Sequence, residues 1–252
     1  MNDQITPHPI LEPNFQSFDP LFAGLKIEVR GTGYQNPLQI LEKIFSKKRR
    51  ETITMGRFTT RALEEDEYRK IILLLRTGYE YNGIKHRPND KIATILVLQA
   101  NLGCRIGDIV TLRTDSIVKD GSIHRLNITE QKTGKKRYFI VPEPIVAFIQ
   151  DYCKCNGITE GALFPGTSGL ECITKDAVWK QLQPVTRYLG LENVSCHSFR
   201  KAYALSIYER TNHDIDLVRT VLQHSSVTIT QNYLRRSDAQ VEAALLANVS
   251  IA

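Results

Sequence analysis

The stretch CHSFRKAYALSIYERTNHDIDLVRTVLQHSSVTITQNYLRR, residues 196–236, decides how the rest of the chain is interpreted. Four of its residues, His197, Arg200, His224 and Tyr233, are groups that can hydrogen-bond an anion. Apolar spacing predicts short helices over about 197–209, 214–222, 226–235 and 238–249, with Asp214, Ser226 and Asp238 as caps. The polar groups therefore lie on or between helices.

His197 and Arg200 are three residues apart, so one helix face presents both and they can hold one anion together. A solvated surface pair is the ordinary alternative. His224 lies at a turn between two predicted helices. Tyr233 follows it nine residues later. A phenol with a pKa near 10 is a poor nucleophile unless cations and hydrogen bonds stabilise its charge, and a packing aromatic is the plainer interpretation.

Upstream, the apolar pattern is helical over about 64–77 and again from Asp90 to Gly103, the second helix being apolar enough to be buried. Arg105 stands just beyond the glycine stop, where helical spacing resumes at Ile106. Arg105 therefore lies at a helix junction. An arginine at such a place is also commonly a surface residue or the partner of a carboxylate such as Asp108.

Between residues 116 and 141 the period changes to that of strands, over 116–118, 123–129 and 137–141, with an Asp-Gly hairpin signal at Asp120. The second connection, QKTGKK, places Lys132 at the tip or shoulder of a hairpin. Such a lysine is usually solvated, although a hairpin is also a good arm for reaching a phosphate. Two further helices are predicted, over 142–155 and from Thr174, and Pro184 should kink or stop the second.

These elements predict a mainly α fold with a small antiparallel β-sheet, of the α+β class, over residues 57–252, ending in a C-terminal helix. Residues 1–56 are rich in proline and are predicted to form an extended arm that ends near the basic run KKRR. DNA contact and an ordinary solvated basic stretch are equally open for that run.

The 252 residues carry a formal net charge of +6, which favours an anionic partner, nucleic acid above all. The five cysteines form no CxxC pair, so neither a disulfide framework nor a zinc ribbon is predicted. No apolar run has the length of a membrane span, and the first residues, MNDQITPHPI, do not resemble a secretory signal. A cytoplasmic protein without membrane association is expected.

The motifs LGCRIGDIVTL, QKTGKK, HSFR, LQHSSVTIT and QNYLR occur here in the order that tyrosine recombinases use. Over about residues 58–240 the chain resembles this family, the phage-integrase class of site-specific DNA recombinases. The resemblance implies the family's catalytic domain fold, and a transesterification in which Tyr233 attacks the scissile phosphate, forms a 3′-phosphotyrosyl bond and releases a 5′-hydroxyl.

The resemblance also implies the role of each residue. Arg105 and Arg200 would clamp the non-bridging oxygens, His197 would assist proton transfer from the tyrosine, and His224 would be a further phosphate ligand. Lys132 would be the general acid. No metal, ATP or other cofactor is expected, because these residues supply the charge and one ester replaces another. Three basic residues beside the hairpin are candidate DNA contacts: Lys135, Lys136 and Arg137.

The resemblance further implies double-stranded DNA as partner, association with the nucleoid when bound, a homo-tetramer on paired sites, and accessory DNA-bending proteins. We expect the recombinase to act for a phage, a plasmid or another mobile element. Two features depart from the family: Gln223 replaces the usual glycine before the second histidine, and the first 56 residues are too short for a full core-binding domain. The alternatives are an accessory DNA-binding protein without productive strand exchange and, less favoured, a type IB topoisomerase.

Overall fold

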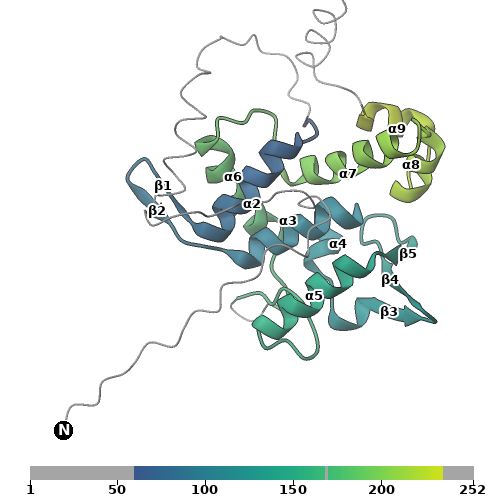
Figure 1. Cartoon of the computed structure of the whole chain (residues 1–252), viewed down its shortest axis with the longest axis horizontal. Helices are drawn as coiled ribbons and strands as arrows, with labels where there is room; N and C mark the ends of the chain where they lie inside the picture. Colours follow the sequence, from purple (N-terminus) through teal and green to yellow (C-terminus); the bar gives the residue numbers. More distant parts are fainter. Residues whose placement is uncertain (1–59, 168–169, 235–252) are drawn as a thin grey trace, which may run out of the picture.

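The computed structural model describes residues 60–167 and 170–234. These residues form one helical body with two small antiparallel sheets, as Figure 1 shows. The elements are α2 (Glu65–Thr77), β1 (Tyr79–Tyr81), β2 (Ile84–His86), α3 (Asp90–Leu102), α4 (Ile106–Val110), the 3₁₀ helix η1 (Thr114–Ser116), β3 (Ile117–Asp120), β4 (Ile123–Thr129), β5 (Lys136–Val141), α5 (Glu143–Cys155), α6 (Lys175–Tyr188), α7 (Cys196–Arg210), α8 (Ile215–Leu222) and α9 (Val227–Leu234).

Helix α3 is the centre of the main core, and every residue from Ile92 to Gln99 in it is buried. It packs against α2, α5, α6 and α7. The Asn89 side chain caps its first turn, and Gly103 ends it in the left-handed conformation, φ +59°. A side chain at Gly103 would collide with the ring of Tyr203, 2.2 Å from an ideal Cβ, so close packing of α7 requires glycine there.

The three-stranded sheet has the order β3-β4-β5, and both pairs are antiparallel. The β4–β5 register pairs Thr129 with Lys136. The intervening turn therefore spans residues 130–135, with Lys132 on it. Strand β5 alternates between exposed and enclosed positions, so Arg137 lies on the inner face between exposed Lys136 and Tyr138.

The last three helices form a small cluster of their own. Ala204 of α7 and Val218 and Leu222 of α8 are fully buried there, and Tyr233 and Leu234 of α9 pack against them. In Figure 1 this cluster lies at the end of α7, beside the edge of the molecule that carries β5. Tyr233, the candidate nucleophile, therefore packs against this small cluster and not against the main core around α3.

The α+β fold and the sheet 117–141 are confirmed. Of the two outcomes expected at Pro184, a kink or a stop, the structure excludes the stop, because helix α6 continues to Tyr188. The segment after α2, where no strand was predicted, forms the hairpin β1–β2, with Asn82 and Gly83 both at positive φ in its turn. The expected arm, 1–56, and the expected helix, 238–249, lie outside the described residues. Among the residues described, no helix has the length and apolarity to cross a membrane.

Candidate active site

Arg200 lies in the first half of α7 and is almost completely enclosed, with 1% of its surface exposed. Its Nη1 donates to the carbonyl of Gly103 at 2.6 Å, and its Nη2 donates to that of Leu222 at 3.0 Å. These bonds join the end of α3 to the end of α8 through one side chain. They also fix the direction of the remaining donor, Nε, which has no partner among the described residues.

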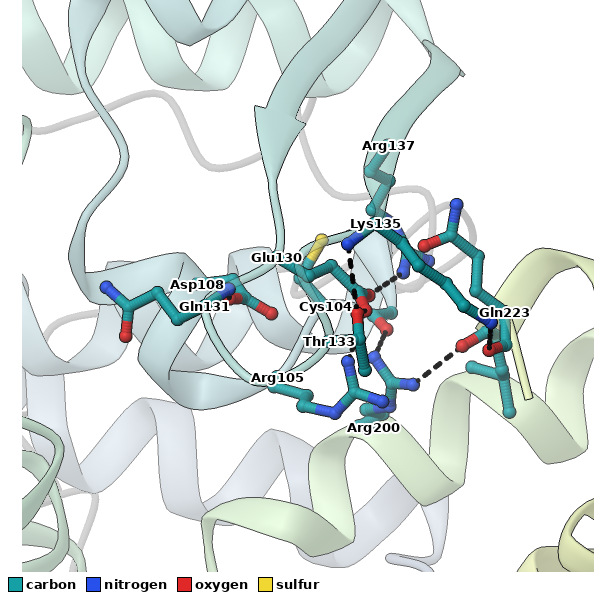
Figure 2. A network of polar contacts seen from close by, with 12 residues as sticks. Cys104, Arg105, Asp108, Glu130, Gln131, Thr133, Lys135, Arg137, Arg200 and Gln223 are labelled. Atoms are coloured by element: carbon teal, nitrogen blue, oxygen red, sulfur yellow. Dashed lines mark hydrogen bonds and ion pairs between the residues drawn. The ribbon is translucent and has the colours of Figure 1, made fainter. Parts of the chain in front are cut away.

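Three successive carbonyls at the end of α8 each accept a hydrogen bond from a cation. Arg137 Nη2 reaches Val221 at 2.6 Å, Arg200 Nη2 reaches Leu222, and Lys135 Nζ reaches Gln223 at 3.4 Å. Cations suit this position because a helix leaves its final carbonyls unpaired and partly negative. Figure 2 shows how residues of β5 and its turn meet this helix end. The hairpin and the segment that carries His224 are thereby attached to each other.

Gln223 adopts the left-handed conformation, φ +55°, that glycine takes more easily. Its side chain donates from Nε2 to the carbonyl of Lys136 at 3.0 Å. Gln223 therefore keeps the left-handed turn that the usual glycine would allow, and its side chain adds a hydrogen bond to β5.

Arg105 caps α4 at the junction with α3, and 22% of its side chain is exposed. Its Nη1 donates to Oε2 of Glu130, which is the single hydrogen-bond partner of the Arg105 side chain within the described part of the chain. Asp108, the partner considered from the sequence, accepts instead from the backbone nitrogen of Gln131 at 2.9 Å. The other donors of Arg105 remain available to an anion.

Tyr233 lies close to both histidines, and its ring is steeply inclined to each imidazole, by 83° for His197 and 69° for His224. The centroids of His197 and of His224 each lie 5.0 Å from that of Tyr233. The hydroxyl of Tyr233 is buried and, like Arg200 Nε, has no hydrogen-bond partner among the described residues. Arg200 opposes the rise in the tyrosine pKa through its charge and through a side-chain hydrogen-bond interaction, although no bond between the two residues meets strict hydrogen-bond geometry.

Burial raises the pKa of Tyr233 to about 12, against the opposing charges of Arg200 and Arg105. Desolvation and nearby cations, Arg200 first, lower the pKa of His224 to about 4. The same causes lower the pKa of His197 to about 4. Because the surface of His197 is largely exposed, desolvation is the weaker argument for its lowered pKa, and the charges of the neighbouring cations are the firmer one. At neutral pH the site therefore holds a protonated phenol between two neutral imidazoles.

His224 is fixed by a contact of its Nδ1 with the hydroxyl of Thr230, at 3.1 Å. That contact occupies one ring nitrogen and leaves Nε2 as the one that can bind a ligand. Lys132 is exposed on the hairpin turn, and its charge contributes to the lowered pKa of His197. The structure thus gathers the six residues singled out from the sequence, with Lys132 on the solvent side.

Arg137 does not lie where it was expected. It is 1% exposed, and its Nη1 forms an ion pair with the buried Glu130 at 2.8 Å. A guanidinium enclosed in this way has no surface to offer DNA, so the expected contact is contradicted for this residue. Lys135 and Lys136 are exposed beside the site.

Two residues of the site were missed from the sequence. Glu130 comes two positions before Lys132, in the same turn motif, and that proximity was the available signal. Lys201 follows Arg200, and its Nζ lies 5.4 Å from the ring centroid of Tyr233 while donating to the carbonyl of Thr60 at 2.6 Å. Its helical spacing of four from His197 places both on one face of α7.

Comparisons with known proteins show similarity to integrases and tyrosine recombinases. The model of the phage integrase family matches residues 61–240. The probable integrase/recombinase YoeC of Bacillus subtilis is 29% identical over 150 residues, which are 60% of this chain and 80% of YoeC. Tyrosine recombinase XerA of Pyrococcus furiosus is 26% identical over 179 residues, which are 69% of this chain and 57% of XerA.

Solved structures resemble the fold. A crystal structure of XerA recombinase has a TM-score of 0.55 at 19% identity, covering 79% of this chain and 67% of that one. A lambda integrase dimer bound to a COC′ core site has a TM-score of 0.54 at 19% identity, covering 73% of this chain and 51% of that one.

The chain belongs to the phage integrase family, the family of the tyrosine recombinases, because the family model covers most of its length. Its match spans about half the length of its Xer relatives. The family supports site-specific recombination in general.

Proposed function

We propose that this protein is a site-specific DNA recombinase that cuts and rejoins DNA through a 3′-phosphotyrosyl intermediate at Tyr233. The observation that carries the proposal is a pair of buried polar atoms, the Tyr233 hydroxyl and Arg200 Nε, neither of which has a partner of good hydrogen-bond geometry among the described residues. Buried polar groups are almost always hydrogen-bonded, so such a pair beside further cations is suited to binding an anionic ligand. A DNA phosphate supplies oxygens for both atoms.

In the proposed reaction, Arg105 and Arg200 bind the non-bridging oxygens of the phosphate and stabilise the charge of the transition state. The Tyr233 oxygen forms a bond to phosphorus while its proton passes to His197, which desolvation and the neighbouring cations keep neutral beforehand. The bond from phosphorus to the 5′-oxygen breaks, and Lys132 donates the proton that this oxygen needs. His224 binds the phosphate through Nε2.

The proposal extends to partners and setting. Double-stranded DNA is the substrate, and exposed Lys135 and Lys136 are proposed to contact its backbone. A homo-tetramer on paired sites, with the C-terminal helix between protomers, is proposed as the working assembly, aided by DNA-bending proteins. Residues 1–56 are proposed as an arm and 57–252 as the catalytic domain. We propose that the protein acts in the cytoplasm and that it serves a mobile element.

The test is covalent capture of DNA. Fragments from the DNA that flanks the gene are incubated with the protein, denatured, and the protein-linked ends are sequenced to locate the cleaved position. A duplex nicked next to that position then accumulates the adduct. Wild-type protein is expected to form an adduct that Tyr233→Phe abolishes, because no other residue replaces the nucleophile.

Tyr208→Phe is the matched control, since Tyr208 lies in the same small cluster but outside the site. It should retain adduct formation. Specific DNA binding by the wild type without any adduct would identify an accessory DNA-binding protein instead. Relaxation of supercoiled DNA at many positions would point to a topoisomerase.

A further inference from the structure

Glu130 is a fully enclosed carboxylate at the start of the turn that carries Lys132. Its Oε1 accepts from Arg137 Nη1 at 2.8 Å. Its Oε2 accepts from Arg105 Nη1 and from the hydroxyl of Thr133, the latter at 2.7 Å. The two oxygens therefore serve different purposes: one holds a buried structural arginine, and the other holds residues of the site (Figure 2).

This carboxylate is ionised despite its burial. Desolvation alone would raise its pKa, but hydrogen bonds from Thr133 and Arg105 and the charges of Arg105 and Arg137 lower it overall. A charge inside a protein is tolerated when it is paired and its lone pairs are satisfied. The negative charge of Glu130 also opposes the mutual repulsion of Arg105, Arg137 and Arg200 before a phosphate arrives.

The same residue holds the turn through its backbone. Its nitrogen donates to the carbonyl of Lys135 at 2.9 Å, and its carbonyl accepts from Gly134 at 2.8 Å. Lys132 lies between these anchor points. A shift of the turn would therefore move Thr133 and the Glu130 carboxylate, and Arg105 would lose the acceptor that orients it.

We infer that Glu130 is a positioning residue: its carboxylate couples the orientation of Arg105 to the turn that presents Lys132, so that phosphate binding and proton donation are arranged together. The inference rests on the proposed function for the roles of Arg105 and Lys132. The contacts themselves do not depend on it.

The first test needs no DNA. The guanidinium of Arg105 is observed by proton–nitrogen NMR, with its signals assigned through Arg105→Lys. In wild-type protein the bond to Glu130 should slow rotation of the guanidinium and separate its Nη signals. Glu130→Gln should merge or lose them, and Glu130→Asp should retain part of the effect. The matched control is Glu143→Gln, which breaks an exposed contact with His124 at the far end of β4 and should change nothing.

The second test measures single-turnover adduct formation at saturating protein. Glu130→Gln is expected to slow it about 10- to 100-fold, because misplacement of a clamp costs rate, while the Kd for the duplex changes less than about threefold. When Arg105 is already replaced by alanine, adding Glu130→Gln should slow adduct formation by a further factor of less than about three, since Glu130 then has no arginine to orient.

The outcomes separate the two proposals. If the NMR signals of Arg105 are unchanged in Glu130→Gln, or if the effects of the two substitutions on the rate multiply, the positioning role is wrong. If the wild type forms no adduct but Glu130→Gln releases Arg105, the recombinase proposal fails and the hold on Arg105 stands. Glu130→Asp keeps the test decisive should the neutral variant fold poorly.

Discussion

At the scale of single residues, the protonation states of the site follow from which charges are enclosed together. Tyr233 keeps its proton because burial outweighs the opposing charge of Arg200, and both histidines are held neutral by desolvation and by the surrounding cations. In the proposed reaction, the phenol would therefore depend on a neutral imidazole beside it to take its proton.

The histidines predict a pH dependence of stability. A group whose pKa is about 4 when folded and 6.5 when unfolded binds fewer protons in the folded chain, so stability falls as the pH falls through that interval. Half-buried His224 should contribute more than exposed His197. Thermal unfolding midpoints measured between pH 7 and 4, in about half-unit steps, should decline less steeply in His224→Gln than in the wild type. Equal slopes would show that the ring of His224 is not held neutral by the fold.

Glu130 also makes the stability of the fold decrease as the pH decreases, but over a lower pH range than the histidines. Its pKa is lowered by folding, so the stability it contributes is present above pH 4.5 and is lost as the pH falls toward its folded pKa. The two effects should therefore be separable in a pH series.

The resemblance to the family singled out six candidate site residues, and their catalytic roles stay predictions. It did not indicate Glu130, the buried carboxylate that accepts from Arg105 and Arg137. Arg137 was misjudged because a basic run was treated as uniformly solvated, although strand alternation turns its last member inward. The need for an internal partner became visible only when Glu130 was seen to be buried.

At the scale of elements, the helices were predictable because their apolar periods are long and their caps are explicit. Asp214, for example, caps α8 as expected, accepting from Leu217 at 2.9 Å. The hairpin β1–β2 was missed although Asn82-Gly83 is a strong signal for such a turn. Its strands have three residues each, which is too short for an alternating pattern to stand out.

Gln223 offers a prediction at this scale. Replacing it by glycine should relieve about 1 kcal/mol of left-handed strain but remove a hydrogen bond of similar worth, so overall stability should change little. The loss of the bond to Lys136 should instead loosen the hairpin. Hydrogen exchange in residues 130–137, followed by mass spectrometry, is expected to become faster. Gln223→Asn, which tolerates the same backbone conformation but has a shorter side chain, should behave alike.

Asn212→Gly is the matched control, because Asn212 is also left-handed, φ +52°, and lies beyond the end of α7. It should leave exchange in the hairpin unchanged. Faster exchange there in the control, or none in Gln223→Gly, would contradict the role given to the side chain.

At the scale of the whole molecule, the described chain has two hydrophobic clusters of very different size. The main one surrounds α3, whereas the one under α8 and α9 has three fully buried members. Regions with few buried apolar contacts open more readily than the rest of a protein. The helix that carries Tyr233 should therefore be the less stable part.

This difference can be measured by native-state hydrogen exchange. Amides of α8 and α9 should exchange faster than those of α3. Leu222→Ala should cost about 2–5 kcal/mol of local stability and accelerate exchange in α8 and α9 while leaving α3 protected. Leu98→Ala, in the centre of α3, should instead lower the unfolding temperature of the whole protein. Equal protection of both regions would show that they unfold as one unit.

The three carbonyls that end α8 have a consequence for building chimaeric recombinases. The β4–β5 hairpin is attached to residues 221–223 through Lys135, Arg137 and Gln223, although more than eighty residues separate them in the chain. Exchange of the hairpin alone would leave α8 with carbonyls that no cation meets. Residues 130–141 and 221–223 should therefore be transplanted together, as one module made of two distant pieces of sequence.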